Sequence, residues 1–268
     1  MNERSKITVI VPTFNEEKNI EACLKSVTWA DEVFVVDSYS EDSTPDIAKK
    51  YANRFVQHEY VNSATQKNWA IPQASHPWVM VVDADERVTK GLKEEILSLL
   101  EKDGAGYDGF YIYRINHFLG KRINHCGWNS DDVLRLFRRD KGRYQDREVH
   151  ADVILEGKSR HLEHKLLHFT FTDFDQYLKK MMRYARWAAG DRAKRTKKVG
   201  IQYLALRPAF RFFKQYILRL GILDGKEGLI LCILAAYSVF LKYAFLYERR
   251  KKEKSGSKSD YIQEKDNE

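Results

Sequence analysis

The chain has 268 residues, 43% of them hydrophobic and 13% aromatic, which is enough to bury one large core with or without an appendage. Its three cysteines (Cys23, Cys126 and Cys232) follow no CxxC or metal-type spacing, which argues against a disulfide framework and for a reducing compartment. The formal charge of +8 is unevenly distributed along the chain, because residues 183–219 hold eleven Arg and Lys against one acid. Such a basic region is expected to attract molecules that carry phosphate groups. The N-terminus lacks the features of a secretory signal, so we expect a cytoplasmic protein.

The first hundred residues alternate between strand and helix patterns. Ile20, Cys23, Leu24 and Val27 recur at i, i+3, i+4 and i+7, which predicts an amphipathic helix. Such βαβ alternation predicts an α/β fold, with a mostly parallel Rossmann-like sheet and helices on both faces. Strands are expected at 7–11, 33–36, 55–56 and 78–82, with further helices near 47–51 and 65–74.

After Leu100 the pattern changes. Alternating segments at 109–114, 133–138 and 151–155 predict more strands, and the chain reads as helical from Phe174 onward. The last eighteen residues are polar and are expected to be disordered.

Residues 228–247 form a run of twenty residues with one charge, Lys242, which is about the length that crosses a hydrocarbon core. An interfacial helix and a buried core helix are the alternatives. The preceding residues, 207–220, interleave aromatic and basic side chains in the manner of a helix that lies on an anionic membrane. We therefore expect attachment to a membrane, by either a spanning or an interfacial helix.

The most informative segment is WVMVVDADERV, residues 78–88. Its unbroken apolar run predicts a strand buried on both faces, and the carboxyl ends of such strands are where open α/β sheets bind ligands. Asp83 and Asp85 follow at i and i+2, which suits a hard cation such as Mg²⁺ or Mn²⁺. The alternative is that both acids only polarise a loop or cap the next helix.

The remaining motifs narrow the kind of nucleotide site. No GxxxxGK[ST] loop is present, and no GxGxxG follows the first strand, which disfavours a P-loop and a dinucleotide-binding site. A nucleotide site that holds its diphosphate through a metal remains. Asp37, at the end of the second expected strand, is placed to accept hydrogen bonds from a base or ribose.

The segments ITVIVPTFNEEKNI, VFVVDSYSEDST, QKNWA and VVDADE resemble, in order and spacing across residues 6–88, the family 2 glycosyltransferases of the GT-A fold. The later segments LRLFRR and REVH and the aromatic C-terminal helices resemble a narrower group, the lipopolysaccharide core glycosyltransferases typified by β-glucosyl transfer to heptose.

The resemblance implies roles for single residues. Asp85 would bind the metal that bridges the donor's phosphates, with Asp83 beside it. Lys67 would assist at the same phosphates, although as an exposed helix lysine it is as consistent with a structural role. The implied nucleoside pocket comprises Pro12, Thr13, Glu16 and Asp37.

Inverting transfer also needs a base that deprotonates the acceptor hydroxyl. The candidates lie in QDREVHAD, where alternate residues of an extended segment share one face. We rank Glu148 first and His150 second, ahead of Asp146 and Asp152. Relatives often read Val-His-Glu, whereas Ala151 follows His150 here, and a merely polar strand face is the alternative.

These observations predict a metal-dependent inverting glycosyltransferase on the cytoplasmic side of a bacterial inner membrane. It would move a hexose, expected to be glucose from UDP-glucose, to a lipid-linked or lipopolysaccharide core saccharide, with anionic lipid and no nucleic acid as partner. Residues 1–172 would be the catalytic GT-A domain, 173–250 a membrane-associating helical region and 251–268 a polar tail. The alternatives are a nucleic-acid-binding protein that uses residues 183–219 and an inactive membrane-bound relative.

Overall fold

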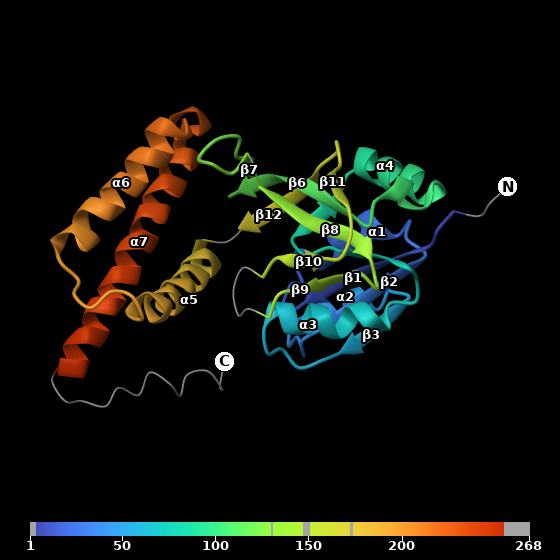
Figure 1. Ribbon diagram of the computed structural model, residues 1–268, viewed down its shortest axis with the longest axis horizontal. Helices are drawn as coiled ribbons and strands as arrows, with labels where there is room; N and C mark the ends of the chain where they lie inside the picture. Colours follow the sequence, from blue (N-terminus) through green and yellow to red (C-terminus); the bar gives the residue numbers. More distant parts are fainter. Residues whose placement is uncertain (1–3, 130, 147–150, 172–173, 255–268) are drawn as a thin grey trace. The chain divides into compact units, whose positions relative to one another are not determined.

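The structure is a computed structural model that describes residues 4–129, 131–146, 151–171 and 174–254 (Figure 1). It divides into two compact units. The first, here called the sheet unit, comprises residues 1–116 and 130–170. The second, here called the helical unit, comprises residues 117–129 and 171–268. The helical unit therefore includes a segment from the middle of the sequence as well as the C-terminal region.

The sheet unit is built on four parallel strands in the order β3-β2-β1-β4, and β8, β6, β12 and β5 extend that sheet. β7 and β11 pair with β6, and β9 and β10 form a separate two-stranded sheet. β4 pairs with β8 in antiparallel register, as do β8 with β6 and β12 with β5. The predicted α/β fold with a mostly parallel core is thus confirmed. The strand bounds are β1 (Ile7–Thr13), β2 (Glu32–Asp37), β3 (Arg54–Gln57), β4 (Trp78–Val81), β5 (Glu86–Val88), β6 (Gly109–Phe118), β7 (Lys121–Arg122), β8 (Asp132–Arg138), β9 (Gly142–Tyr144), β10 (Val153–Leu155), β11 (Ser159–His161) and β12 (Leu166–Phe171).

Helices cover both faces of this sheet, because alternate residues of a strand point to opposite faces. Val9 and Val11 of β1 belong to a core cluster with residues of α1, α2 and α4, whereas Ile10 belongs to a second cluster with residues of α3. The apolar stripe from Ile20 to Val27 is fully buried, as its spacing predicts. The helices of the sheet unit are α1 (Ile20–Val27), α2 (Thr44–Ala48), α3 (Ser63–Ala70) and α4 (Lys90–Glu101).

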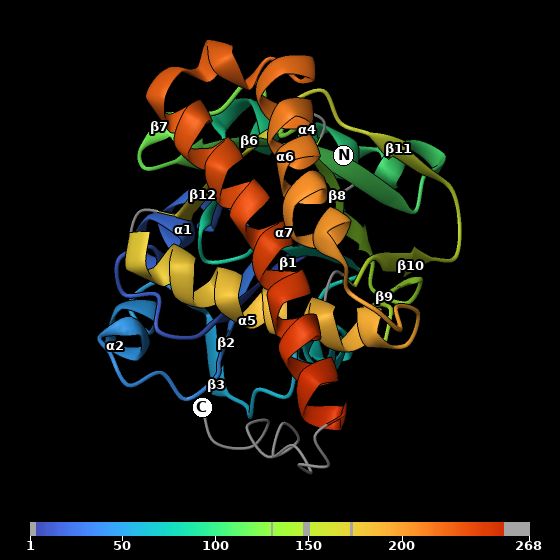
Figure 2. The ribbon, with the colours of Figure 1, turned by 90° about the vertical axis from the view of Figure 1, so that its left-hand side faces the viewer.

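Within its described residues, the helical unit contains the helices α5, α6 and α7 with the short helical turns between them, and the 117–129 segment with β7. α6 and α7 lie side by side and run in opposite directions, and α5 also packs against α7 (Figure 2). The bounds are α5 (Phe174–Ala193), η3 (Gln202–Leu206), α6 (Arg207–Phe213), η4 (Lys214–Leu218), η5 (Gly221–Asp224) and α7 (Gly225–Lys254). Among the described residues, one helix is long and apolar enough to cross a membrane by length and composition, with a mean hydropathy of 2.1 over its apolar window.

Candidate active site

The site lies at the carboxyl edge of the parallel strands. Thr13 of β1 pairs in register with Asp37 of β2, and β1 also pairs in parallel with β4, which leads directly into Asp83. The backbone N–H of Val82 donates to the carbonyl of Ile10 at 3.0 Å, so β4 stays beside β1 up to the first acid. The sheet therefore brings the ends of three strands, and the residues expected to hold a nucleotide, to one edge.

The residues at this edge differ in how their polar groups are satisfied. The Asp37 carboxylate is fully buried and accepts three hydrogen bonds. Ser40 donates from its backbone N–H (2.9 Å) and from its hydroxyl, and Gln57 donates from Nε2 (3.1 Å). Glu16 is half-buried and accepts from Asn19 Nδ2 at 2.8 Å. Pro12 is also half-buried, beside Val36.

Thr13 is the exception at this edge. Its side chain is 4% exposed, and within the described part of the chain its hydroxyl has no hydrogen-bond partner. A buried polar group without a partner costs about 1–3 kcal/mol, which makes such a group rare in folded proteins. The Thr13 hydroxyl is therefore available to bind a ligand at the end of β1.

Asp83 is held between two cations. Lys67 Nζ of α3 lies 2.8 Å from Asp83 Oδ1, and the Arg135 guanidinium of β8 donates to Oδ2. Burial alone would raise the pKa of Asp83, but Arg135 and Lys67 outweigh burial and hold that pKa well below its usual range. The expectation of an exposed Lys67 is wrong, because this side chain is buried beneath Asp83 and over the Tyr144 ring. The charge of Asp83 is thus already compensated by the protein.

Glu86, which the sequence argument did not use, completes this ion-pair cluster. Its carboxylate is wholly buried, accepts from Arg135 Nη2 at 2.7 Å and lies 3.4 Å from Arg114 Nη1. Its other oxygen accepts from the backbone N–H of Asp83 at 3.0 Å, which closes the turn that carries both acids. Arg135 therefore links Asp83 to Glu86, and these ion pairs together with the Asp83 N–H···Glu86 bond hold the Asp83-Ala84-Asp85 turn.

Asp85 faces a different partner, His168 of β12, which the sequence argument also missed. β12 pairs with β5, and the backbone N–H of Phe169 donates to the Asp85 carbonyl at 2.8 Å. This pairing places His168 Nε2 3.5 Å from Asp85 Oδ2. The imidazole is 13% exposed, so both groups lie in a largely enclosed position.

A chain of hydrogen bonds sets the tautomer of His168. Arg114 donates twice to Asp131, at 3.0 and 2.6 Å, so this carboxylate is ionised and can only accept. It accepts from Asn116 Nδ2 at 2.9 Å, which turns the amide oxygen of Asn116 toward His168 Nδ1 at 2.6 Å. Nδ1 therefore carries the proton in the neutral ring, and Nε2 keeps its lone pair toward Asp85.

Asp85 Oδ2 and His168 Nε2 converge to 3.5 Å, which places a carboxylate oxygen and an imidazole nitrogen where both can contact one cation. A carboxylate oxygen suits Mn²⁺ or Mg²⁺ that completes its coordination with substrate phosphates and water, and the added imidazole nitrogen favours the transition metal Mn²⁺ over Mg²⁺. Within the described residues, no group of three or more His, Cys, Asp and Glu side chains gathers as a metal cage. The donor set fits an ion shared with a bound diphosphate better than an ion held by the protein alone.

The base candidates Glu148 and His150 lie outside the described residues, whereas the other two candidates, Asp146 and Asp152, are exposed.

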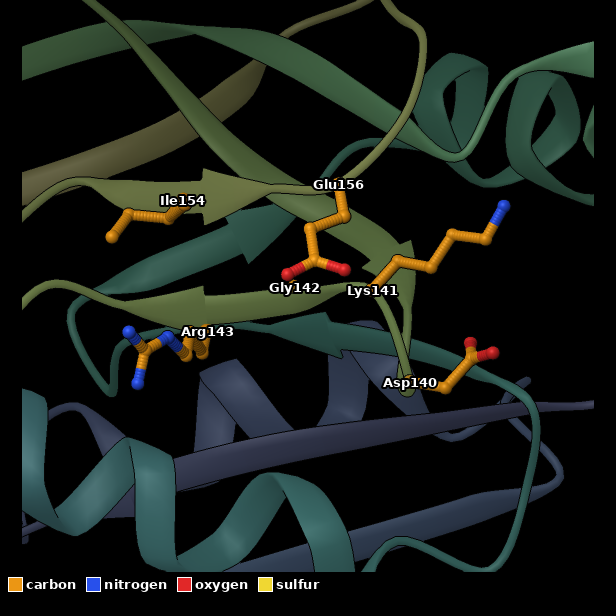
Figure 3. A pocket seen from close by; sticks show the side chains of 6 residues that line it. All are labelled: Asp140, Lys141, Gly142, Arg143, Ile154 and Glu156. Carbon is orange, nitrogen blue, oxygen red and sulfur yellow. The ribbon is translucent and has the colours of Figure 1, made fainter.

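A hollow of about 70 Å³ on the β9–β10 ribbon is lined by residues 140–143, 154 and 156 (Figure 3). It includes none of the carboxylates at the sheet edge and has no part in this site.

Comparison with known proteins decides the family. The sequence profile described as "Glycosyl transferase family 2" matches residues 8–154, more than half of the chain, and spans all the strand ends described above. The chain belongs to glycosyl transferase family 2. It is therefore a glycosyltransferase, as the motifs of residues 6–88 predict.

The alignments of this glycosyltransferase with several relatives cover nearly its whole length. The lipopolysaccharide core biosynthesis glycosyltransferase LpsC of Rhizobium meliloti is 29% identical and aligns over 91% of this chain and 92% of its own. An uncharacterised glycosyltransferase of Rickettsia conorii is 28% identical over 96% and 95% of the two chains. The mannosyltransferase PcManGT of Pyrobaculum calidifontis was solved with GDP-Man and Mn²⁺. It superposes with a TM-score of 0.51 at 17% sequence identity, over 96% of this chain and 77% of its own. This likeness confirms the GT-A type of fold.

Proposed function

We propose that this glycosyltransferase is a metal-dependent inverting enzyme that moves glucose from UDP-glucose to a lipopolysaccharide core or other lipid-linked saccharide. The observation that carries the proposal is the pair of acceptors, Asp85 Oδ2 and His168 Nε2, facing each other at the edge of the parallel strands. The name of the relative LpsC supports the class of acceptor, and the Mn²⁺ in the PcManGT complex supports the cofactor.

Each group at the edge then has a task. Asp85 and His168 would hold a Mg²⁺ or Mn²⁺ ion, which when bound would neutralise negative charge on the departing diphosphate. Lys67 and Arg135 keep Asp83 ionised. The nucleoside lies against the end of β1 and β2, where Pro12, Thr13, Glu16 and Asp37 are found.

The acceptor hydroxyl loses its proton to a base as it attacks the anomeric carbon. We assign this role to Glu148, with His150 as the second candidate. Both lie a few residues after Asp146 in the sequence.

The enzyme works on the cytoplasmic side of the bacterial inner membrane. Residues 1–172 carry catalysis, residues 173–250 attach the protein to the membrane, and residues 251–268 form a polar tail. The net charge of +10 over residues 183–219 attracts anionic lipid and an anionic acceptor.

A thermal-shift screen of nucleotide sugars tests the donor and the cofactor together. UDP-glucose with Mn²⁺ is expected to raise the melting temperature by several degrees, because a ligand at 100 times its Kd stabilises the folded state by about 2.7 kcal/mol. UDP-glucose with a chelator should give a much smaller shift, and GDP-mannose should give none. If no nucleotide sugar stabilises the protein with either metal, the proposal is wrong.

Replacing His168 with Ala is expected to raise the Mn²⁺ concentration that gives half-maximal transfer by about 10–100-fold, because one of two protein ligands is lost. Titration of initial rates with Mn²⁺ measures this change. His164→Ala is the matched control, since His164 is exposed on the same unit and pairs with Glu95 instead. Equal Mn²⁺ requirements in the two variants would contradict the role of His168.

Replacing Thr13 with Val is expected to raise the KM for the donor by roughly 3–10-fold, which corresponds to one hydrogen bond of about 0.5–1.5 kcal/mol. The fold should be as stable as the wild type or more so, because the hydroxyl has no partner among the described residues. Thr8→Val is the control: its buried hydroxyl donates to Glu32 at 2.6 Å, so this variant should lose stability and keep its KM. Donor titrations and urea unfolding separate the two outcomes.

A further inference from the structure

Cations from α5 and α6 contact the C-terminal half of α7. Arg207 Nη1 donates to the Tyr243 hydroxyl at 3.0 Å, and the Arg186 guanidinium lies over the Phe245 ring, 5.2 Å from its centre. A helix that crossed the bilayer along this length would carry these guanidinium groups into hydrocarbon, at a cost of several kcal/mol each.

Lys242 adds to the same argument. Burial lowers the pKa of this half-buried lysine, and Arg192, Arg207 and Arg211 lower it further, so several cations are close to the middle of α7. Because Lys242 is itself a cation, the run of α7 that has no charge of its own ends at Leu241. Its fourteen residues, 228–241, extend over roughly 21 Å, whereas a hydrocarbon core is about 30 Å thick. This run is too short to cross.

Apolar side chains are nevertheless exposed where α6 gives way to α7. Leu218 is 61% exposed and Leu223 is 65% exposed, and Leu220 and Ile222 between them are half exposed. We call these four residues the apolar tip. Monomeric soluble proteins rarely leave such clustered apolar surface in water.

The apolar tip is held in a fixed conformation. Leu220 has a φ of 54°, and the buried Asp224 carboxylate accepts from the backbone N–H groups of Asn124 (3.1 Å) and His125 (2.9 Å). Lys121 Nζ donates to the Asp224 carbonyl at 2.8 Å. Hydrogen bonds from the 117–129 segment therefore hold the turn in place. The exposed apolar side chains belong to an ordered turn and not to a frayed helix end.

Both helices beside the tip continue its apolar surface and add positive charge. Phe210, Phe213 and Ile217 are exposed at helical spacing before the tip, and Ile233 and Tyr237 are exposed after it. The basic side chains in the same stretch and in the segment that holds the turn are Lys121, Arg122, Arg207, Arg211, Lys214, Arg219 and Lys226. Such a surface suits an anionic membrane, because its apolar side chains can insert among acyl chains while its basic side chains are attracted to the anionic head groups.

We infer that α6 and α7 form a monotopic anchor, which inserts the apolar tip into one leaflet of an anionic bilayer and does not span it. This inference rests on the proposed membrane attachment and states its geometry. The occupant of the exposed apolar surface is the lipid bilayer, and both ends of α7 stay on the cytoplasmic side.

Binding of the full chain to vesicles tests the tip. The wild type is expected to sediment with vesicles of phosphatidylcholine and 30 mol% phosphatidylglycerol and to be released by 1 M NaCl only in part. The double variant Ile222→Glu/Leu223→Glu should bind at least tenfold more weakly and keep its donor affinity. Ile201→Glu is the matched control, because Ile201 is 73% exposed but lies at the start of η3, away from the tip. Equal losses in both variants would overturn the role of the tip.

Labelling with a membrane-impermeant maleimide on sealed inverted inner-membrane vesicles tests the geometry. Lys251→Cys, near the end of α7, and Lys50→Cys, on the sheet unit, should react equally without detergent. If Lys251→Cys reacts only after detergent, α7 spans the membrane and the monotopic anchor is wrong while membrane attachment stands. If the wild type does not bind vesicles at all, attachment itself is wrong. A tip variant that changes only the mass in solution would assign the tip to a second copy of the chain.

Discussion

Replacing Asp85 with Asn is expected to reduce glycosyl transfer by about a thousandfold, roughly 4 kcal/mol of transition-state stabilisation. The amide keeps the size of the side chain and removes the charge that attracts the divalent ion. Lys67 and Arg135 pair with Asp83, and Asn keeps the hydrogen-bonding capacity of the Asp85 side chain, so the urea midpoint should change less than the rate. Initial rates with labelled UDP-glucose, at saturating Mn²⁺, measure the effect.

Asp132→Asn is the control for this variant, because Asp132 is an acid of the same unit that pairs with His161. It should keep the wild-type rate. An Asp85→Asn enzyme with undiminished turnover would remove Asp85 from the site. An enzyme that lost activity together with its fold would leave the rate uninterpretable, which is why unfolding is measured on the same preparations.

Replacing Arg135 with Met is expected to lower the free energy of unfolding by about 3–5 kcal/mol. Arg135 is buried and pairs with both Asp83 and the wholly buried Glu86, and its loss leaves these carboxylates without their shared cation. Methionine keeps much of the volume, so the cost is electrostatic more than steric. Urea unfolding followed by circular dichroism gives the difference.

Two further variants identify the cause of this loss. Arg143→Met, on the exposed face of β9, should change the unfolding free energy by less than about 0.5 kcal/mol. Adding Glu86→Gln to Arg135→Met should restore part of the stability, because the uncompensated charge is removed. An Arg135→Met protein as stable as the wild type would show that the cluster does not hold the turn.

Local sequence patterns were sufficient to predict the class of fold and the sheet edge at which the site lies. The unbroken apolar run of β4 predicts a strand with both faces covered, and the spacing of Ile20 to Val27 predicts the buried face of α1. These signals are local, since periodicity and strand ends are properties of adjacent residues. The position of Asp83 and Asp85 at the end of β4, and the family, follow from the same local segments.

The difference between the two acids, Asp83 and Asp85, comes from long-range contacts in the folded chain. Asp83 is compensated by Arg135, which is 52 residues away and reaches it through the antiparallel pairing of β4 with β8. Asp85 faces His168 because β12 pairs with β5, and the alternation of β12 alone does not tell which of its residues meets an acid. Likewise, Arg207 of α6 and Arg186 of α5 contact the C-terminal half of α7, and the sequence of α7 alone does not show these contacts. The charge state and partner of a side chain depend on long-range contacts, and no local pattern encodes these contacts.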